Sequence, residues 1–117
     1  MVNFASVVPI LPVSDMKQAV INYERLGFKV TAYETGDYAF ALRDEAAIHL
    51  AKVAETDPVH SQVAVYLYVD NADNLAEEWK HVPGELVRPA DTVYGLREGA
   101  YIDPDGNLIR YGSKLKS

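Results

Sequence analysis

A pattern of apolar residues that occurs twice restricts the fold of this chain more than any other feature. Residues 15–26 (DMKQAVINYERL) and 71–82 (NADNLAEEWKHV) each place apolar side chains at the spacing of one helix face. The same spacing also relates the residues that precede the helices. The matched pairs are Val13 and Val69, Met16 and Ala72, Ala19 and Leu75, Val20 and Ala76, Tyr23 and Trp79, and Leu26 and Val82. So many matches in one register indicate an internal duplication.

Strand-like runs accompany both predicted helices, one before each helix and three after it. After the first helix they are residues 29–34, 38–43 and 46–52; residues 62–69 precede the second helix, and 85–89, 100–102 and 108–111 follow it. Residues 90–98 are predicted to form a long loop. The sequence therefore predicts an α+β fold, in which two βαβββ modules form a curved, half-open mixed β-sheet barrel with the helices outside. We expect a single domain over 1–117, with modules at about 5–52 and 62–112 and a linker at 53–61.

Composition excludes several classes of function. The chain has 117 residues, a formal net charge of −6 and no cysteine. A disulfide framework, a thiolate metal site and a cysteine nucleophile are therefore ruled out, and a cytoplasmic location is expected. The negative charge disfavours nucleic acid and anionic membrane surfaces as partners, and it favours a cationic small molecule. No apolar run approaches the roughly 20 residues that cross a bilayer.

Alternation along the strands predicts which side chains face the hollow of the barrel. In residues 62–69, the four valine and leucine side chains are expected to face the helix, so Tyr66 and Tyr68 point the other way. By the same argument His49 faces the hollow between Ile48 and Leu50. Arg110, between Ile109 and Tyr111, also faces it. The hollow is therefore expected to be a lined pocket rather than a dry core.

Two motifs carry a family resemblance over nearly the whole chain. YERLGF (23–28) ends the first helix, and DPDGNLIR (103–110) forms the closing hairpin. With the paired modules, they resemble the vicinal oxygen chelate superfamily, also called the glyoxalase/bleomycin resistance/dioxygenase family. Its enzymes hold a divalent metal with side chains from equivalent strands of both halves. Those positions fall here on Val8, His49, Ala64 and Arg110. Valine and alanine have no ligand atom, and arginine stays cationic, so we expect no metal and no cofactor.

Without a metal, the chain resembles the antibiotic-binding branch, the bleomycin resistance proteins, especially in SVVPILPVSD (6–15) and IDPDGNLIR (102–110). Members of that branch are dimers with crevices between subunits, often with an exchanged N-terminal arm. The resemblance implies a non-enzymatic protein that sequesters a cationic aromatic antibiotic of the bleomycin type. The alternatives are a metal-dependent lyase, isomerase or dioxygenase, and a small-molecule sensor. The candidate ligand-binding residues are Tyr38, His49, Tyr66, Tyr68, Tyr94 and Arg110.

Several of these residues also have a purely structural interpretation. Arg110 is expected either to contact a ligand or, more in keeping with a cation in a sheet, to form a buried structural ion pair with an acidic neighbour. His49 fits a ligand contact or a buried, hydrogen-bonded imidazole, and Tyr66 and Tyr68 fit a ligand wall or an interface. Tyr94 lies in a loop that either caps the crevice or turns the chain. Trp79 occupies the helical stripe, which favours core packing over stacking on a ligand.

Overall fold

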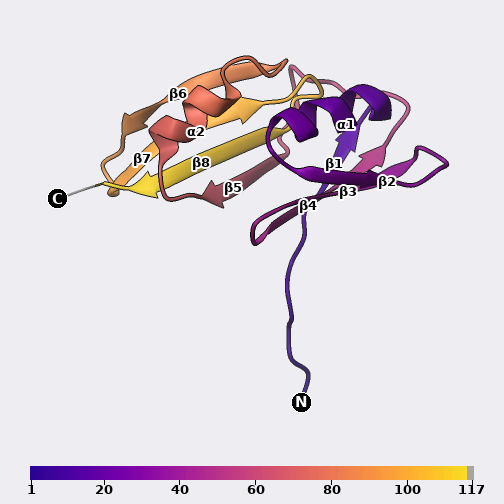
Figure 1. The fold of residues 1–117 in the computed structure, drawn as a ribbon, viewed down its shortest axis with the longest axis horizontal. Coiled ribbons are helices and arrows are strands. Elements are labelled where there is room, and N and C mark those ends of the chain that lie inside the picture. The colour runs from indigo at the N-terminus through magenta and orange to yellow at the C-terminus, as the bar shows by residue number, and fades with distance from the viewer. Residues whose placement is uncertain (116–117) are drawn as a thin grey trace.

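Two copies of the same sequence of elements make up the chain (Figure 1). The computed structural model describes residues 1–115. The first module comprises β1 (Ile10–Val13), α1 (Met16–Arg25), β2 (Lys29–Ala32), β3 (Tyr38–Arg43) and β4 (Ala46–Lys52). The second comprises β5 (Ala64–Tyr68), α2 (Ala72–Trp79), β6 (Glu85–Asp91), β7 (Leu96–Ile102) and β8 (Leu108–Lys114). The predicted α+β fold with two βαβββ modules is confirmed.

Equivalent side chains begin the two helices. The side chain of Asp15 accepts a hydrogen bond from the backbone N–H of Gln18, and that of Asn71 accepts one from Asn74. Such caps satisfy an amide that has no partner within the helix. After α1, Gly27 takes a φ of +91°, a conformation that glycine adopts without strain and that ends the helix. The duplicated pattern thus produces duplicated helix boundaries.

Each module forms its own four-stranded mixed sheet. The strand order is β1-β4-β3-β2 in the first sheet and β5-β8-β7-β6 in the second. In both, the first strand pairs in parallel with the last, and the other pairs are antiparallel. Figure 1 shows the two sheets side by side, with α1 and α2 covering the same side of them. One side of each sheet is therefore left without a helix.

The core lies between the sheets and the helices. Tyr23 and Leu26 of the first stripe are fully buried, and Trp79 of the second is 1% exposed. Trp79 packs edge-on against Tyr101 and Tyr111, at ring-centroid distances of 5.8 and 5.5 Å. Its indole N–H donates to the carbonyl oxygen of Leu26 at 3.0 Å. The interpretation of Trp79 as a core residue is confirmed, because its ring is enclosed and its polar atom is satisfied.

The main error of the sequence-based prediction concerns residues 90–98, which were expected to form a loop. In the structure β6 continues to Asp91 and β7 starts at Leu96, so only residues 92–95 connect them. The pairing register shifts between Val87 and Ala90, which marks an irregularity in β6. Residues 90–98 lack the regular alternation of apolar and polar side chains by which a strand is recognised in a sequence, so the strands were not predicted there. Helix α2 is also shorter than predicted, since it ends at Trp79 rather than at residue 82.

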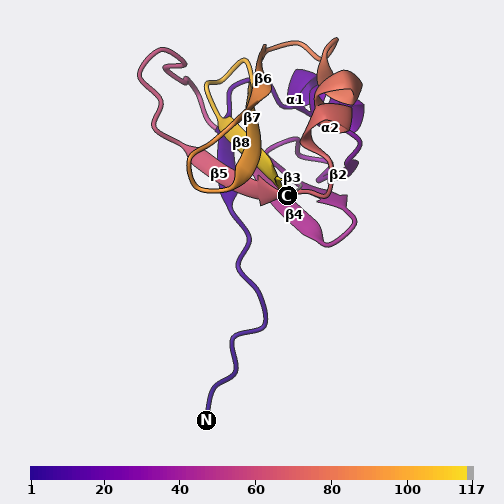
Figure 2. The same cartoon turned by 90° about the vertical axis from the view of Figure 1, so that its left-hand side faces the viewer.

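Residues 1–9 extend away from the two sheets (Figures 1 and 2). Pro9 contributes the last contact to the first sheet, where its carbonyl accepts from the N–H of His49 at 2.9 Å. Three apolar side chains of this arm, Val2, Phe4 and Val7, are between 87% and 93% exposed. Within residues 1–115, no helix is long and apolar enough to cross a membrane.

Candidate ligand-binding site

The side of each sheet that α1 and α2 do not cover is called the open face here. In the second module Arg110 lies opposite Ala100 on β7 and beside Tyr66 on β5, so all three share the open face. The residues on either side of Arg110, Ile109 and Tyr111, are fully buried toward α2. The alternation that predicted an outward Arg110 is therefore confirmed, and so is the outward position of Tyr66 and Tyr68.

Glu98 is the centre of the polar contacts on this face. Its carboxylate accepts hydrogen bonds from the hydroxyls of Tyr66 and Tyr94, each at 2.7 Å. Arg110 Nη1 lies 3.1 Å from Glu98 Oε1 and forms an ion pair with it. Only 9% of the Glu98 side chain is exposed, although the surrounding residues are open to solvent. One carboxylate thus joins three predicted site residues. Together with Tyr66, Tyr94 and Arg110, Glu98 forms what we call the Glu98 cluster.

The cluster shifts the acidity of its members. The hydrogen bond from Tyr94 lowers the pKa of Glu98, and those from Tyr66 and Arg110 act in the same direction against partial burial. Desolvation, together with the hydrogen bond to Glu98, raises the pKa of Tyr66 to about 12. The pKa of Tyr94 is also raised, mainly by its hydrogen bond to Glu98. At neutral pH, Glu98 is therefore an anion that accepts hydrogen bonds from two neutral phenols and one guanidinium.

Aromatic rings flank this anion. Tyr66 and Tyr68 have ring centroids 4.8 Å apart, with an angle of 44° between the ring planes. Tyr68 is 76% exposed, Tyr94 61% and Tyr66 37%. Flat aromatic groups that stand on a sheet at low conformational cost are suited to stacking against the rings of a ligand. The second module therefore offers exposed rings next to a fixed negative charge.

The remaining two predicted residues lie on the open face of the first module. The hydroxyl of Tyr38 is 2.8 Å from Nδ1 of His49. Phe40 packs edge-on against His49 at a centroid distance of 4.6 Å, and Tyr33 contacts both Phe40 and Tyr38. His49 is half-buried among these rings. The structure therefore groups the six predicted residues into two sets, Tyr38 with His49 and the other four around Glu98.

The positions that hold metal in enzymes of the resembled family do not fit a metal here. Val8 and Ala64 have no ligand atom, and the guanidinium of Arg110 is engaged with Glu98. His49 alone has a suitable nitrogen, and its Nδ1 already contacts Tyr38. Within residues 1–115, no three histidine, aspartate or glutamate residues form a group that could hold a metal ion. We therefore derive no metal-dependent chemistry from these positions.

Glu98 is the residue that sequence reasoning missed, because it fell in the segment predicted to be a loop. Counting back from Tyr101, which is fully buried toward α2, would have placed Ala100 and Glu98 on the open face together. The expected ion pair of Arg110 also called for an acidic residue on the open face. The expected pairing of Arg110 with an acidic neighbour is confirmed by the ion pair with Glu98, but the expectation that the pair is buried is wrong, because 46% of the Arg110 side chain is exposed.

Comparison with known proteins places this architecture in a family. Residues 3–111 match the Glyoxalase/Bleomycin resistance protein/Dioxygenase superfamily. A bleomycin resistance protein from Geobacillus stearothermophilus is 27% identical over 129 residues, an alignment that covers 94% of this chain and 97% of the relative. A bleomycin resistance protein from Staphylococcus aureus has the same identity and coverage.

Solved structures share the fold. A bleomycin-binding protein complexed with bleomycin superposes with a TM-score of 0.84 at 22% identity, covering 96% of this chain and 100% of the other. The bleomycin-binding protein from Streptomyces verticillus, complexed with copper(II)-bleomycin, gives a TM-score of 0.79 at 23% identity, with 98% and 100% covered. At these identities, the similarity establishes a common fold.

Proposed function

This chain belongs to the Glyoxalase/Bleomycin resistance protein/Dioxygenase superfamily, and on that basis we propose that it binds and sequesters a cationic aromatic antibiotic of the bleomycin type. Binding alone, without chemical change of the drug, protects the target of the drug. A dissociation constant of about 1 μM, or roughly −8 kcal/mol, is sufficient when the protein is in excess over the drug.

The observation that carries this proposal is the pairing of exposed aromatic rings with a fixed anion. Tyr66 and Tyr68 form a ring pair on the open face, and the Glu98 carboxylate lies next to it. Rings of this kind stack on planar groups of a drug. The formal charge of −6 attracts a cationic tail over longer distances. The similarity to bleomycin resistance proteins over 94% of the chain supports the same ligand class.

The proposal includes a homodimer. The open face exposes apolar side chains, among them Ile10 (57%), Leu42 (51%) and Val87 (47%), and the arm of residues 1–9 adds more. Extended apolar surface of this kind commonly marks an interface with another protein. A second copy of the chain facing the first would turn the open face into a crevice and bring aromatic rings to both of its walls. We also propose a cytoplasmic location, where the drug would be intercepted.

The experiment that tests the proposal is a calorimetric titration of the purified protein with metal-free and with copper-loaded bleomycin. Saturable binding with a dissociation constant of about 1 μM or tighter supports sequestration. Absence of binding at millimolar drug would contradict it. Elemental analysis of the same sample distinguishes the enzyme alternative, which requires a stoichiometric divalent metal. Light scattering tests the dimer separately, and a monomer at high protein concentration would contradict a crevice built from two subunits.

A further inference from the structure

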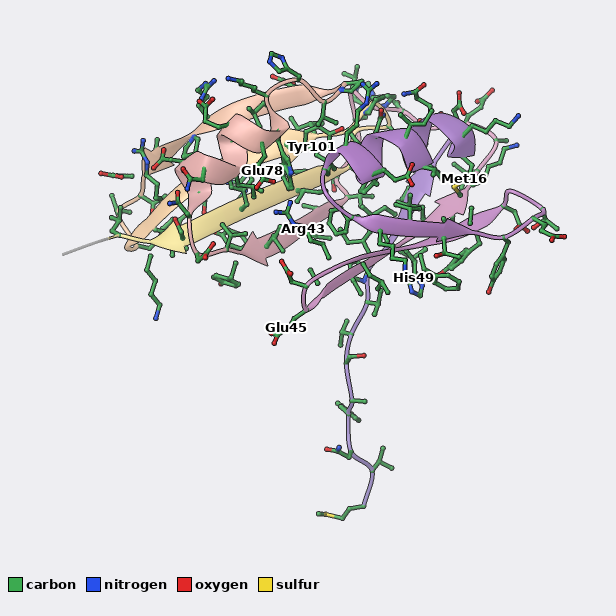
Figure 3. All side chains as sticks on the ribbon, viewed as in Figure 1. Met16, Arg43, Glu45, His49, Glu78 and Tyr101 are labelled. Atoms are coloured by element: carbon green, nitrogen blue, oxygen red, sulfur yellow. The ribbon has the colours of Figure 1, made fainter. Side chains whose placement is uncertain are left out.

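Because the chain is duplicated, the modules meet at two junctions. Equivalent elements form both junctions, but different side chains occupy them. At each junction, the turn before the last strand of one module reaches the helix of the other. In the first, Asp103 in the β7–β8 turn accepts a hydrogen bond from Tyr23 of α1 at 2.8 Å. In the second, Arg43 at the β3–β4 turn forms an ion pair with Glu78 of α2 at 3.1 Å. Figure 3 shows Arg43 and Glu78 pointing toward each other between the modules.

The β7–β8 turn, which is longer than the β3–β4 turn, occupies the first junction. Asp105 Oδ1 accepts hydrogen bonds from the backbone N–H of Ser14 at 3.0 Å and from its hydroxyl at 2.7 Å. The hydroxyl of Thr56 donates to the same oxygen at 2.6 Å. Asp105 is 9% exposed, so this carboxylate is packed into the space in front of α1. A cavity of about 560 Å³ also borders this turn at Asp103 and Gly106, but its lining includes no residue of α1.

The second junction has a shorter turn and contains a cavity. Arg43 pairs with Ala46, which leaves only Asp44 and Glu45 to make the turn. In front of α2 lies a cavity of about 640 Å³, which this turn helps to line. Its apolar wall includes Phe28, Leu75 and Trp79. A cavity of this size accommodates a small organic molecule.

The charge of the cavity selects the kind of molecule. Four carboxylates line it, those of Asp44, Glu45, Asp70 and Glu78, against one cationic side chain, Arg43. Arg43 is already engaged, because its Nη1 donates to the carbonyl of Leu26 at 2.8 Å and pairs with Glu78. Within residues 1–115, no basic side chain forms an ion pair with the other three carboxylates. Anions are therefore repelled and cations attracted.

We propose that this junction cavity binds a small organic cation with an apolar body, of the arylalkylamine class. The ammonium group would lie among Glu45, Asp70 and Asp44, and the apolar body would lie against the half-buried lining residues Leu67 and Val69. The site is distinct from the Glu98 cluster, and of the six candidate ligand-binding residues only Tyr68 lines the cavity. The proposal does not depend on drug binding, since it rests on the lining and charge of this cavity alone.

The test uses three probes of the same shape and different charge, namely 4-phenylbutylamine, 4-phenylbutanol and 4-phenylbutyrate. Each is titrated into the ¹⁵N-labelled full chain and followed by NMR. We expect saturable shifts for the amine at Asp44, Glu45, Asp70 and Asn74 and at the Trp79 indole. At low salt, the amine should bind at least about 5-fold more tightly than the alcohol, the size of effect that one exposed ion pair provides. The butyrate should not bind, and added salt should reduce the preference.

Three variants separate the effect of charge from the effect of shape. Glu45→Gln combined with Asp70→Asn should weaken amine binding about 5-fold or more, whereas Glu24→Gln combined with Glu55→Gln makes the same charge change away from the cavity and should leave it within about 2-fold. Ala46→Trp, at a half-buried lining position, should block the amine and the alcohol. Equal binding of amine and alcohol would overturn the proposal. Shifts confined to Tyr66, Tyr94 and Glu98, or equal losses in the two charge variants, would also overturn it.

Discussion

The hydroxyl of Tyr23 on α1 donates a hydrogen bond of 2.8 Å to Oδ2 of Asp103, a residue of the opposite module. Asp103 is 4% exposed, and its other oxygen accepts from the backbone N–H groups of Asp105 and Asn107. Burial raises the pKa of Asp103, against the opposing effect of these hydrogen bonds. The contact therefore both joins the modules and supports a buried carboxylate.

Tyr23→Phe should lower the free energy of unfolding by about 1–3 kcal/mol, because it removes one donor from a buried acceptor. The pKa of Asp103 should rise further for the same reason. Urea denaturation followed by fluorescence measures the first effect. Tyr33→Phe, which removes a hydroxyl from a ring that is 52% exposed, is the matched control and should change stability by no more than about 0.5 kcal/mol. Equal stability of the two variants would show that the contact does not join the modules.

Glu98→Gln should weaken binding of bleomycin while keeping the size of the side chain. The amide cannot neutralise Arg110, so the open face loses its anion and gains an unpaired cation. We expect an increase of up to about 5-fold in the dissociation constant at low salt, since exposed ion pairs contribute up to about 1 kcal/mol. Calorimetry at two salt concentrations measures it. An unchanged dissociation constant would exclude Glu98 from the binding site.

Gly112→Ala should affect binding more than stability. A Cβ at this position would collide with the hydroxyl of Tyr66, which belongs to the neighbouring strand β5 and pairs with Arg110. The exposed end of the Tyr66 ring can move aside, so the free energy of unfolding should stay within about 1 kcal/mol of the wild type. The displaced ring would lose its hydrogen bond to Glu98 and its position beside Tyr68. A stacking contact contributes about 0.5–1.5 kcal/mol, so bleomycin should bind roughly 2- to 12-fold more weakly. Wild-type affinity in this variant would contradict a role for the Tyr66 ring.

The lowered pKa of Glu98 predicts a pH dependence of stability. Its folded pKa lies below the value of about 4.3 that is usual for an unfolded chain. The contribution of Glu98 is therefore fully present above pH 4.3 or so and is lost as the pH falls through the folded pKa. Carboxyl ¹³C NMR should find the Glu98 midpoint below that of an unstructured glutamate. Tyr94→Phe should raise the midpoint, because it removes the hydrogen bond that lowers it most. A midpoint at or above 4.3 in the wild type would contradict this assignment.

Residues governed by local periodicity could be predicted from the sequence. The buried helix stripes follow from a repeat of 3.6, and the outward position of Arg110, Tyr66 and Tyr68 follows from a repeat of 2. Glu98 could not be placed in the same way, because the irregular register of β6 and the charged start of β7 hide the strand. The contact of Tyr23 with Asp103 was also out of reach, since it depends on how the two modules pack. Nor could periodicity show that His49 and Tyr38 lie apart from the Glu98 cluster.

The open face of the second module is the proposed binding site for an aromatic cation. An NMR titration of the ¹⁵N-labelled protein with metal-free bleomycin locates the site. We expect saturable shifts that are largest for the backbone amides of Tyr66, Tyr68, Tyr94, Glu98 and Arg110. Saturable shifts that leave these five amides in place, or no saturable shifts at millimolar drug, would contradict it.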